Sequence, residues 1–93
     1  MRLVDLNPQW VGHSGEDVAG WAIQFDCPCQ RGGCPPISVM FDNPIAGEPL
    51  GQGYKWHRVG EDFEILTLTP SILRSRQDCQ WHGFVTNGEI ITV

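Results

Sequence analysis

Hydrophobic and polar residues alternate in several short stretches of the chain. Residues 20–26 (GWAIQFD) place aromatic and aliphatic side chains at every second position, and residues 37–41 (ISVMF) repeat the pattern. An alternation with period two is typical of a strand with one buried face. Nowhere do apolar residues recur at helical spacing over three turns. The pattern therefore predicts an all-β protein.

Turn residues indicate where the strands of the second half begin and end. Asn87-Gly88 predicts a two-residue hairpin, because a type I′ turn needs positive φ at both positions. Pro70 has no N–H to donate to a neighbouring strand, so we expect a strand to end there. With these boundaries, strands are predicted at 55–59, 63–68, 81–86 and 89–93.

Composition sets the size of the fold. Glycine and proline account for 11 and 7 of the 93 residues, which is typical of short elements joined by turns. A chain of this length forms one domain, so we expect residues 1–93 to fold as a single small antiparallel β domain. A domain this small often needs a disulfide or a metal ion for stability.

The net charge and the short apolar runs argue against nucleic acid and membranes as partners. The chain carries 6 basic and 11 acidic residues, a net charge of −5, whereas a nucleic-acid-binding surface needs clustered positive charge. No apolar run approaches the roughly 20 residues that span a bilayer, and the N-terminal segment lacks the apolar core of a secretion signal. We therefore expect a cytoplasmic protein with reduced cysteines that binds neither nucleic acid nor membrane.

The cysteines form the strongest chemical signal in the sequence. Cys27, Cys29 and Cys34 lie within eight residues, and Cys79 stands three residues before His82. Zinc prefers four sulfur or nitrogen ligands in a tetrahedron, which two short knuckles can supply in pairs. We predict a structural zinc held by Cys27, Cys29, Cys79 and His82, with Cys34 as the reserve ligand that could replace Cys29.

Two other interpretations of the cysteines remain open. Four cysteines can form two disulfides in three connectivities, and the layout is similar to the Cys-x-His … Cys-x-x-His pattern of Rieske iron–sulfur proteins. Cys29 stands where Rieske proteins have histidine, which favours zinc over a two-iron cluster. The expected fold is thus a small sheet with zinc-ribbon-like or Rieske-like metal knuckles.

No residue outside the cysteine knuckles is predicted to carry chemistry. Ser71 lacks the context of a nucleophile elbow, so we expect its hydroxyl to cap a turn after Pro70. His13 and His57 are single histidines without ligand spacing, and Asp26 reads as a solvated neighbour of the metal site. We therefore assign no catalytic residue.

Four strings also carry a family resemblance. They occur in the order FDCPC at 25–29, DNP at 42–44, LTLTPSI at 66–72 and CQWHGFVTNG at 79–88. This combination resembles a family of small phage and prophage proteins whose members often carry the label ammonia monooxygenase, a name that no chemistry in the sequence supports. The resemblance implies a phage origin and a metal role for the four ligands chosen above, and it implies no reaction.

These observations together predict a binding protein more readily than an enzyme. An acidic, phage-type domain with a structural zinc would act as a protein-interaction module, in host takeover, in blocking host defence or as a minor assembly component. Its expected partner is another protein, and the domain itself is expected in the cytoplasm, that of the host cell if it is phage-encoded. The alternative is a metal-dependent enzyme with an open zinc or a Rieske-like redox centre.

Overall fold

The computed structural model describes residues 1–12, 20–29, 31–49, 52–76 and 79–93. Apart from one short 3-10 helix, the regular structure of these residues consists of two antiparallel sheets, which confirms the all-β prediction. Within these ranges, the helical structure lacks the length and hydrophobicity that a membrane-spanning helix requires. The elements are η1 (Leu3–Leu6), β1 (Gln9–Val11), β2 (Ala22–Phe25), β3 (Ile37–Met40), β4 (His57–Val59), β5 (Thr67–Arg76), β6 (Cys79–Thr86) and β7 (Glu89–Thr92).

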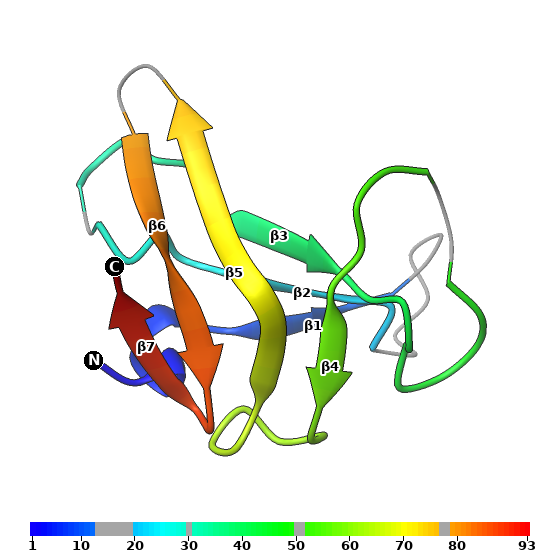
Figure 1. Cartoon of the computed structure of the whole chain (residues 1–93). Coiled ribbons are helices and arrows are strands. Elements are labelled where there is room, and N and C mark those ends of the chain that lie inside the picture. The colour runs from blue at the N-terminus through cyan, green and yellow to red at the C-terminus, as the bar shows by residue number, and fades with distance from the viewer. Residues whose placement is uncertain (13–19, 30, 50–51, 77–78) are drawn as a thin grey trace.

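The two sheets pack against each other around a shared core. One sheet has the order β1-β2-β3 and the other the order β4-β5-β6-β7, and in Figure 1 the strands of the three-stranded sheet run across those of the four-stranded sheet. A bridge between Phe41 and Trp56 joins the chain after β3 to the start of β4. The core draws its buried side chains from η1 and both sheets: Leu3, Leu6, Ile23, Phe25, Cys27, Ile37, Val39, Phe41, Leu66, Leu68, Ile72, Cys79, Trp81, Val85 and Ile90.

The alternating stretches of the first half form the strands that their pattern predicts. Ile23 pairs with Val39 and Phe25 with Ile37 in the β2–β3 ladder, and all four side chains are buried. Ser38, between two buried positions, is exposed. Because successive side chains of a strand point to opposite faces, the apolar positions reach the core together.

The prediction that a strand ends at Pro70 is wrong. Residues 63–65 form a turn, and β5 then runs through Pro70 to Arg76. The β5–β6 register shifts between Leu68 and Ile72, so Pro70 lies where the ladder is already irregular. A proline is tolerated at such a position because no regular ladder bond is lost there.

The hairpin predicted at Asn87-Gly88 is confirmed. β6 and β7 pair from Thr86 and Glu89 outward, and the two turn residues have φ of 49° and 77°. The hairpin therefore has the two positive φ angles that a type I′ turn requires.

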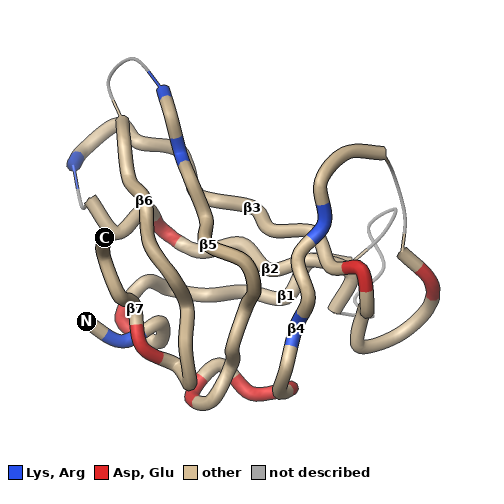
Figure 2. The backbone as a smooth tube through the Cα atoms, viewed as in Figure 1, with Lys and Arg blue, Asp and Glu red and all other residues tan. Residues whose placement is uncertain are grey.

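Charged residues lie mainly in the loops and toward the ends of the strands. Figure 2 shows no charged residue on β6, whereas acidic residues gather in the loop before β5 and arginines lie at the far end of β5. The middle of the four-stranded sheet is therefore an uncharged surface.

Candidate functional site

Strand β6 places the two predicted ligands of its knuckle on opposite faces. Its residues are alternately buried and exposed along its whole length, so that Cys79 and Trp81 face the core while Gln80 and His82 face outward. Residues three apart on a strand cannot share a face. The structure therefore does not bring His82 to the cysteines, because Cys79-x-x-His82 is part of a strand and not a metal knuckle.

All four cysteines come together on the core side of the four-stranded sheet. Their Sγ atoms lie within 4.8 Å of one another. Cys27 and Cys29 lie 3.4 and 3.7 Å from Cys79, and Cys29 lies 3.3 Å from Cys34. Cys34, the reserve ligand of the sequence analysis, thus takes the fourth place that His82 was expected to fill.

The cluster fits a metal ion such as zinc. Zinc–thiolate bonds of about 2.3 Å in a tetrahedron place sulfurs about 3.8 Å apart, close to the separations just given. The donor set is also of the right chemistry, since four soft sulfurs in a tetrahedral site favour zinc. The loop after β2 supplies Cys27, Cys29 and Cys34, and the start of β6 supplies Cys79.

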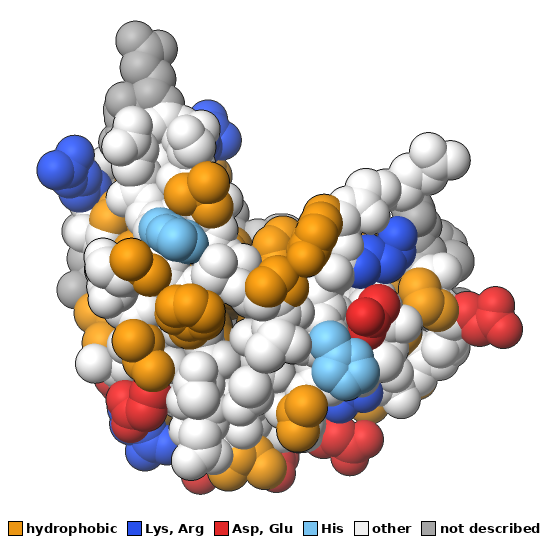
Figure 3. Space-filling view, in the orientation of Figure 1, with side chains coloured by type: hydrophobic (Ala, Val, Ile, Leu, Met, Phe, Trp, Pro, Cys, Tyr) orange, Lys and Arg blue, Asp and Glu red, His pale blue; other side chains and the backbone are white. Residues whose placement is uncertain are grey.

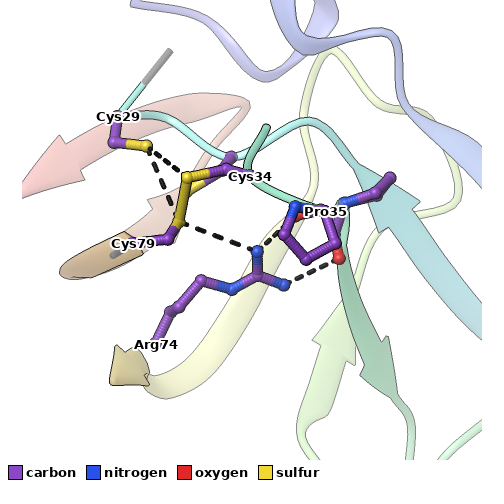
Figure 4. The surroundings of a disulfide bond; sticks show 7 residues. Cys29, Cys34, Pro35, Arg74 and Cys79 are labelled. Atoms are coloured by element: carbon purple, nitrogen blue, oxygen red, sulfur yellow. Dashed lines mark hydrogen bonds between the residues drawn. A yellow bond between two sulfur atoms is a disulfide. The ribbon is translucent and has the colours of Figure 1, made fainter. Parts of the chain in front are cut away.

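Figure 4 shows three of these cysteines, Cys29, Cys34 and Cys79, with a disulfide between Cys34 and Cys79. Arg74 of β5 approaches from the other side: one guanidinium nitrogen lies 3.9 Å from the Cys79 sulfur and also donates to the Pro35 carbonyl, and the other donates to the Pro36 carbonyl at 2.7 Å. Arg74 therefore ties the cysteine loop to β5 and places a positive charge beside the sulfurs.

The two free cysteines differ in acidity. Burial raises the pKa of the Cys27 thiol above its usual value. A hydrogen bond from the backbone N–H of Arg31 lowers the pKa of the Cys29 thiol, because it stabilises the thiolate. Cys29 is thus the more readily deprotonated of the two.

The outward face of the same sheet holds a second polar pair. The Nε2 atom of His82 lies 3.0 Å from the Oγ atom of Ser71. The expectation that the Ser71 hydroxyl caps a turn is wrong, since Ser71 lies inside β5 and its hydroxyl faces a histidine of β6. The pair lies on the face of the sheet opposite to the cysteines.

The strand register positions this pair. Leu73 lies directly opposite His82 in the β5–β6 ladder, so Ser71, two residues before Leu73, is the diagonal neighbour of His82. Diagonal neighbours on one face of a sheet are within reach of a long side chain. The indole N–H of Trp56 donates to the Ser71 carbonyl at 3.2 Å and fixes the backbone that carries the hydroxyl.

The remaining candidates of the sequence analysis lie elsewhere. His57 is exposed and its Nδ1 atom lies 3.0 Å from an Asp42 carboxylate oxygen. Asp26 is exposed beside the cysteine loop, as expected. His13 lies outside the described residues. The sequence did carry one signal for the missed serine: the TPS and WHG strings that were singled out for the family resemblance contain Ser71 and His82.

A serine hydroxyl within hydrogen-bond distance of an imidazole nitrogen is the arrangement by which serine hydrolases pair a nucleophile with its base. The sheet thus presents a candidate hydrolase site on one face and a cysteine cluster on the other. A family model described as bacterial ubiquitination-like system serine protease (BubE) matches residues 4–93. The chain belongs to this family.

This membership corrects two expectations. The resemblance to an uncharacterised phage family is wrong, and so is the function of a phage-type protein-interaction module, because the family match covers nearly the whole chain and describes a bacterial protease. Neither the curated proteins nor the solved structures give a match to the chain.

Proposed function

We propose that this protein is a serine peptidase in which Ser71 is the nucleophile and His82 the general base. The observation that carries the proposal is the 3.0 Å separation between Ser71 Oγ and His82 Nε2, a distance at which the imidazole can accept the hydroxyl proton. Membership in a family described as serine proteases supports the same reaction.

The reaction follows from the geometry of the pair. With its own proton on Nδ1, the His82 imidazole accepts the hydroxyl proton at Nε2 while Ser71 Oγ attacks the carbonyl carbon of the scissile peptide bond. The resulting tetrahedral intermediate collapses when the C–N bond breaks, and His82 gives the proton to the leaving amine. Water, deprotonated by His82, then hydrolyses the ester on Ser71 and restores the free hydroxyl.

The rigid surroundings of the pair support a catalytic role. Both residues lie on strands and not on loops, and Trp56 holds the Ser71 backbone through its indole N–H. Catalysis requires that the nucleophile and base be held in place before the substrate arrives, because ordering them during the reaction would add to the barrier.

We also propose that the reduced protein binds one structural zinc through Cys27, Cys29, Cys34 and Cys79. The three sulfur separations given above and the donor set support this assignment, which requires the Cys34–Cys79 disulfide to be reduced. The ion would hold the loop after β2 against the start of β6. It would take no part in the peptidase reaction, since the cysteines and His82 lie on opposite faces of the sheet.

Covalent labelling tests the peptidase. A fluorophosphonate probe, which reacts with activated serines, should label wild-type protein at Ser71, as located by mass spectrometry of the digested protein. Ser71→Ala should lose labelling and lower the cleavage of a proteome-derived peptide mixture by on the order of 10³-fold or more.

Thr69→Ala is the matched control, because Thr69 is an exposed hydroxyl residue two positions earlier on β5. It should keep both the labelling and the cleavage. Equal cleavage by wild-type protein and Ser71→Ala, with both variants folded, would show that Ser71 is not the nucleophile.

A further inference from the structure

The outer face of the four-stranded sheet is apolar around the Ser71–His82 pair. Leu73 is 67% exposed, Ile91 48% and Phe84 39%. Figure 3 shows hydrophobic side chains gathered around the histidine that lies over β5 and β6. Contiguous exposed apolar side chains on a small protein mark a binding surface more often than isolated ones do.

The register fixes where these side chains lie relative to the reacting atoms. Leu73 is the direct cross-strand neighbour of His82, and Phe84, two residues beyond His82 on β6, pairs with Ile91. Positions two apart on one face of a strand are about 7 Å apart. The apolar side chains therefore lie within one or two residue lengths of the catalytic pair.

Two aromatic side chains, Tyr54 and Trp56, lie beside Ser71. The rings of Tyr54 and Trp56 meet edge to face with centroids 4.8 Å apart, and Trp56 is bonded to the Ser71 carbonyl. Tyr54 is 61% exposed. We call the surface formed by Tyr54, Leu73, Phe84 and Ile91 the outer apolar face.

A pocket opens beside the histidine. It has a volume of about 270 Å³ and is lined by Leu73, Arg74, Ser75, Gln80, Trp81 and His82. The guanidinium of Arg74, its charged lining residue, is bonded to the Pro35 and Pro36 carbonyls. The pocket thus offers apolar and polar surface next to the general base, and its guanidinium is already bonded to two backbone carbonyls.

We propose that the outer apolar face binds an extended polypeptide substrate with apolar side chains next to the scissile bond. A peptide bond can react only when its carbonyl carbon lies within about 3.5 Å of Ser71 Oγ. Residues of an extended chain follow one another at about 3.3 Å, so the residues beside the scissile bond must cover Leu73 and Phe84. Charged side chains there would lose water without gaining a partner.

This inference rests on the proposed peptidase activity and names its substrate class. Cleavage sites in a proteome-derived peptide mixture, mapped by mass spectrometry, should show apolar residues within two positions of the cleaved bond. Leu73→Ser should lower kcat/KM for these peptides by about tenfold, the effect of losing contact with one apolar side chain. Leu73→Arg should shift the preference toward peptides with acidic residues at the same positions.

Ile65→Ser is the control, since Ile65 is 51% exposed but lies in the turn before β5. It should cleave the same peptides at the wild-type rate. Cleavage sites flanked by charged residues, or an unchanged rate in Leu73→Ser, would overturn the assignment of this face.

A binding experiment tests the outer apolar face independently of peptide cleavage. The Ser71→Ala variant is titrated with a ten-residue peptide that has leucines on both sides of a central Gly-Gly, and with a matched peptide that has glutamates instead. The leucine peptide should shift the methyl resonances of Leu73 and Ile91 and leave those of Val4 and Ile65 in place.

Selective binding of the leucine peptide without any cleavage by wild-type protein would support the outer apolar face and overturn the peptidase proposal. Absence of binding, or equal binding of the glutamate peptide, would overturn the face itself, whatever the activity.

Discussion

At the scale of single residues, the position of His82 on strand β6 determines which groups its side chain can reach. A histidine three residues after a cysteine suggests a metal ligand, but on a strand the same spacing turns the side chain away from the sulfurs. Its Nε2 atom instead lies 3.0 Å from the hydroxyl of Ser71. The two interpretations of His82 predict different losses on substitution.

We expect His82→Gln to abolish peptide cleavage and to leave the zinc content and the melting temperature close to wild type. Glutamine keeps a polar side chain of similar length but cannot act as the base. Metal analysis, thermal melting and the peptide assay check the three quantities on one preparation.

His57→Gln is the control for His82→Gln. His57 is an exposed histidine of β4 whose partner is Asp42, and its substitution should preserve cleavage. Loss of zinc in His82→Gln would restore the metal-ligand interpretation.

The cysteines also differ from one another at this scale. In zinc-free protein that retains the Cys34–Cys79 disulfide, near neutral pH, we expect iodoacetamide to alkylate Cys29 before Cys27. The pKa of Cys29 is lowered by the Arg31 backbone N–H, and that of Cys27 is raised by burial, so Cys29 holds more of the reactive thiolate. The difference should shrink as the pH rises past both values. Timed alkylation followed by peptide mapping measures it, and faster reaction of Cys27 would contradict it.

At the scale of elements, β5 and β6 carry both sites. Their inward side chains include Cys79 and Arg74, and their outward side chains include Ser71 and His82. The loop after β2 completes only the cysteine cluster. Changes in that loop should therefore affect the cluster first and the catalytic pair only through stability.

We expect Cys34→Ser to lose zinc, and we expect the same of Cys27→Ser and Cys79→Ser. The sequence by itself made Cys34 only the reserve ligand, whereas its sulfur lies 3.3 Å from that of Cys29 within the cluster. Serine preserves the shape of the side chain and removes the soft ligand. Metal analysis of the purified variants decides, and a full equivalent of zinc in Cys34→Ser would return the fourth position to another ligand.

The β6–β7 hairpin provides a test of the fold that does not depend on either site. Gly88 has φ of 77°, and a Cβ added there would meet the Glu64 carbonyl. Gly47 has φ of 78° and open space around the same position. We expect Gly47→Ala to destabilise by about 1 kcal/mol from backbone strain, and Gly88→Ala by a further ~1–3 kcal/mol from overpacking.

Urea unfolding of the two glycine variants measures this difference directly. Equal losses of stability would mean that the loop holding Glu64 moves away without cost, and that the hairpin does not pack against it as the structure has it.

At the scale of the whole molecule, two small sheets share one core. The four cysteine side chains form one edge of this core. Cys27 and Cys79 belong to the buried core, and Cys29 and Cys34 pack against it. A chain of 93 residues buries a limited apolar surface, so a metal at this edge would contribute a large share of the stability.

We expect reduced protein to contain about one zinc per chain and to unfold when a chelator removes it. Structural zinc sites contribute on the order of 10 kcal/mol of apparent binding free energy, more than the roughly 5 kcal/mol that a domain of this size has in total. Metal analysis and circular dichroism before and after chelation test this. A chelated, reduced protein that melts at the same temperature as the untreated protein would contradict it.

Much of the fold follows from local pattern. The period of two in residues 37–41 places Ile37, Val39 and Phe41 in the core, and Asn87-Gly88 specifies its hairpin by backbone conformation alone. The presence of a cysteine cluster could also be predicted, because three cysteines within eight residues have few other roles. The passage of β5 through Pro70 could not, since it depends on a register shift against β6.

The sequence by itself thus determined the all-β class, the hairpin and a sulfur-rich site. Only the tertiary structure decided which side chains share a site, because that depends on the face each strand turns to its neighbours. A strand at Cys79–Thr86 turns Cys79 and His82 to opposite faces, and the loop after β2 places Cys34 among the sulfurs instead. The same strand, paired with β5, brings His82 to the hydroxyl of Ser71. The spacing of residues within either strand does not predict this contact, because it depends on the register between the two strands.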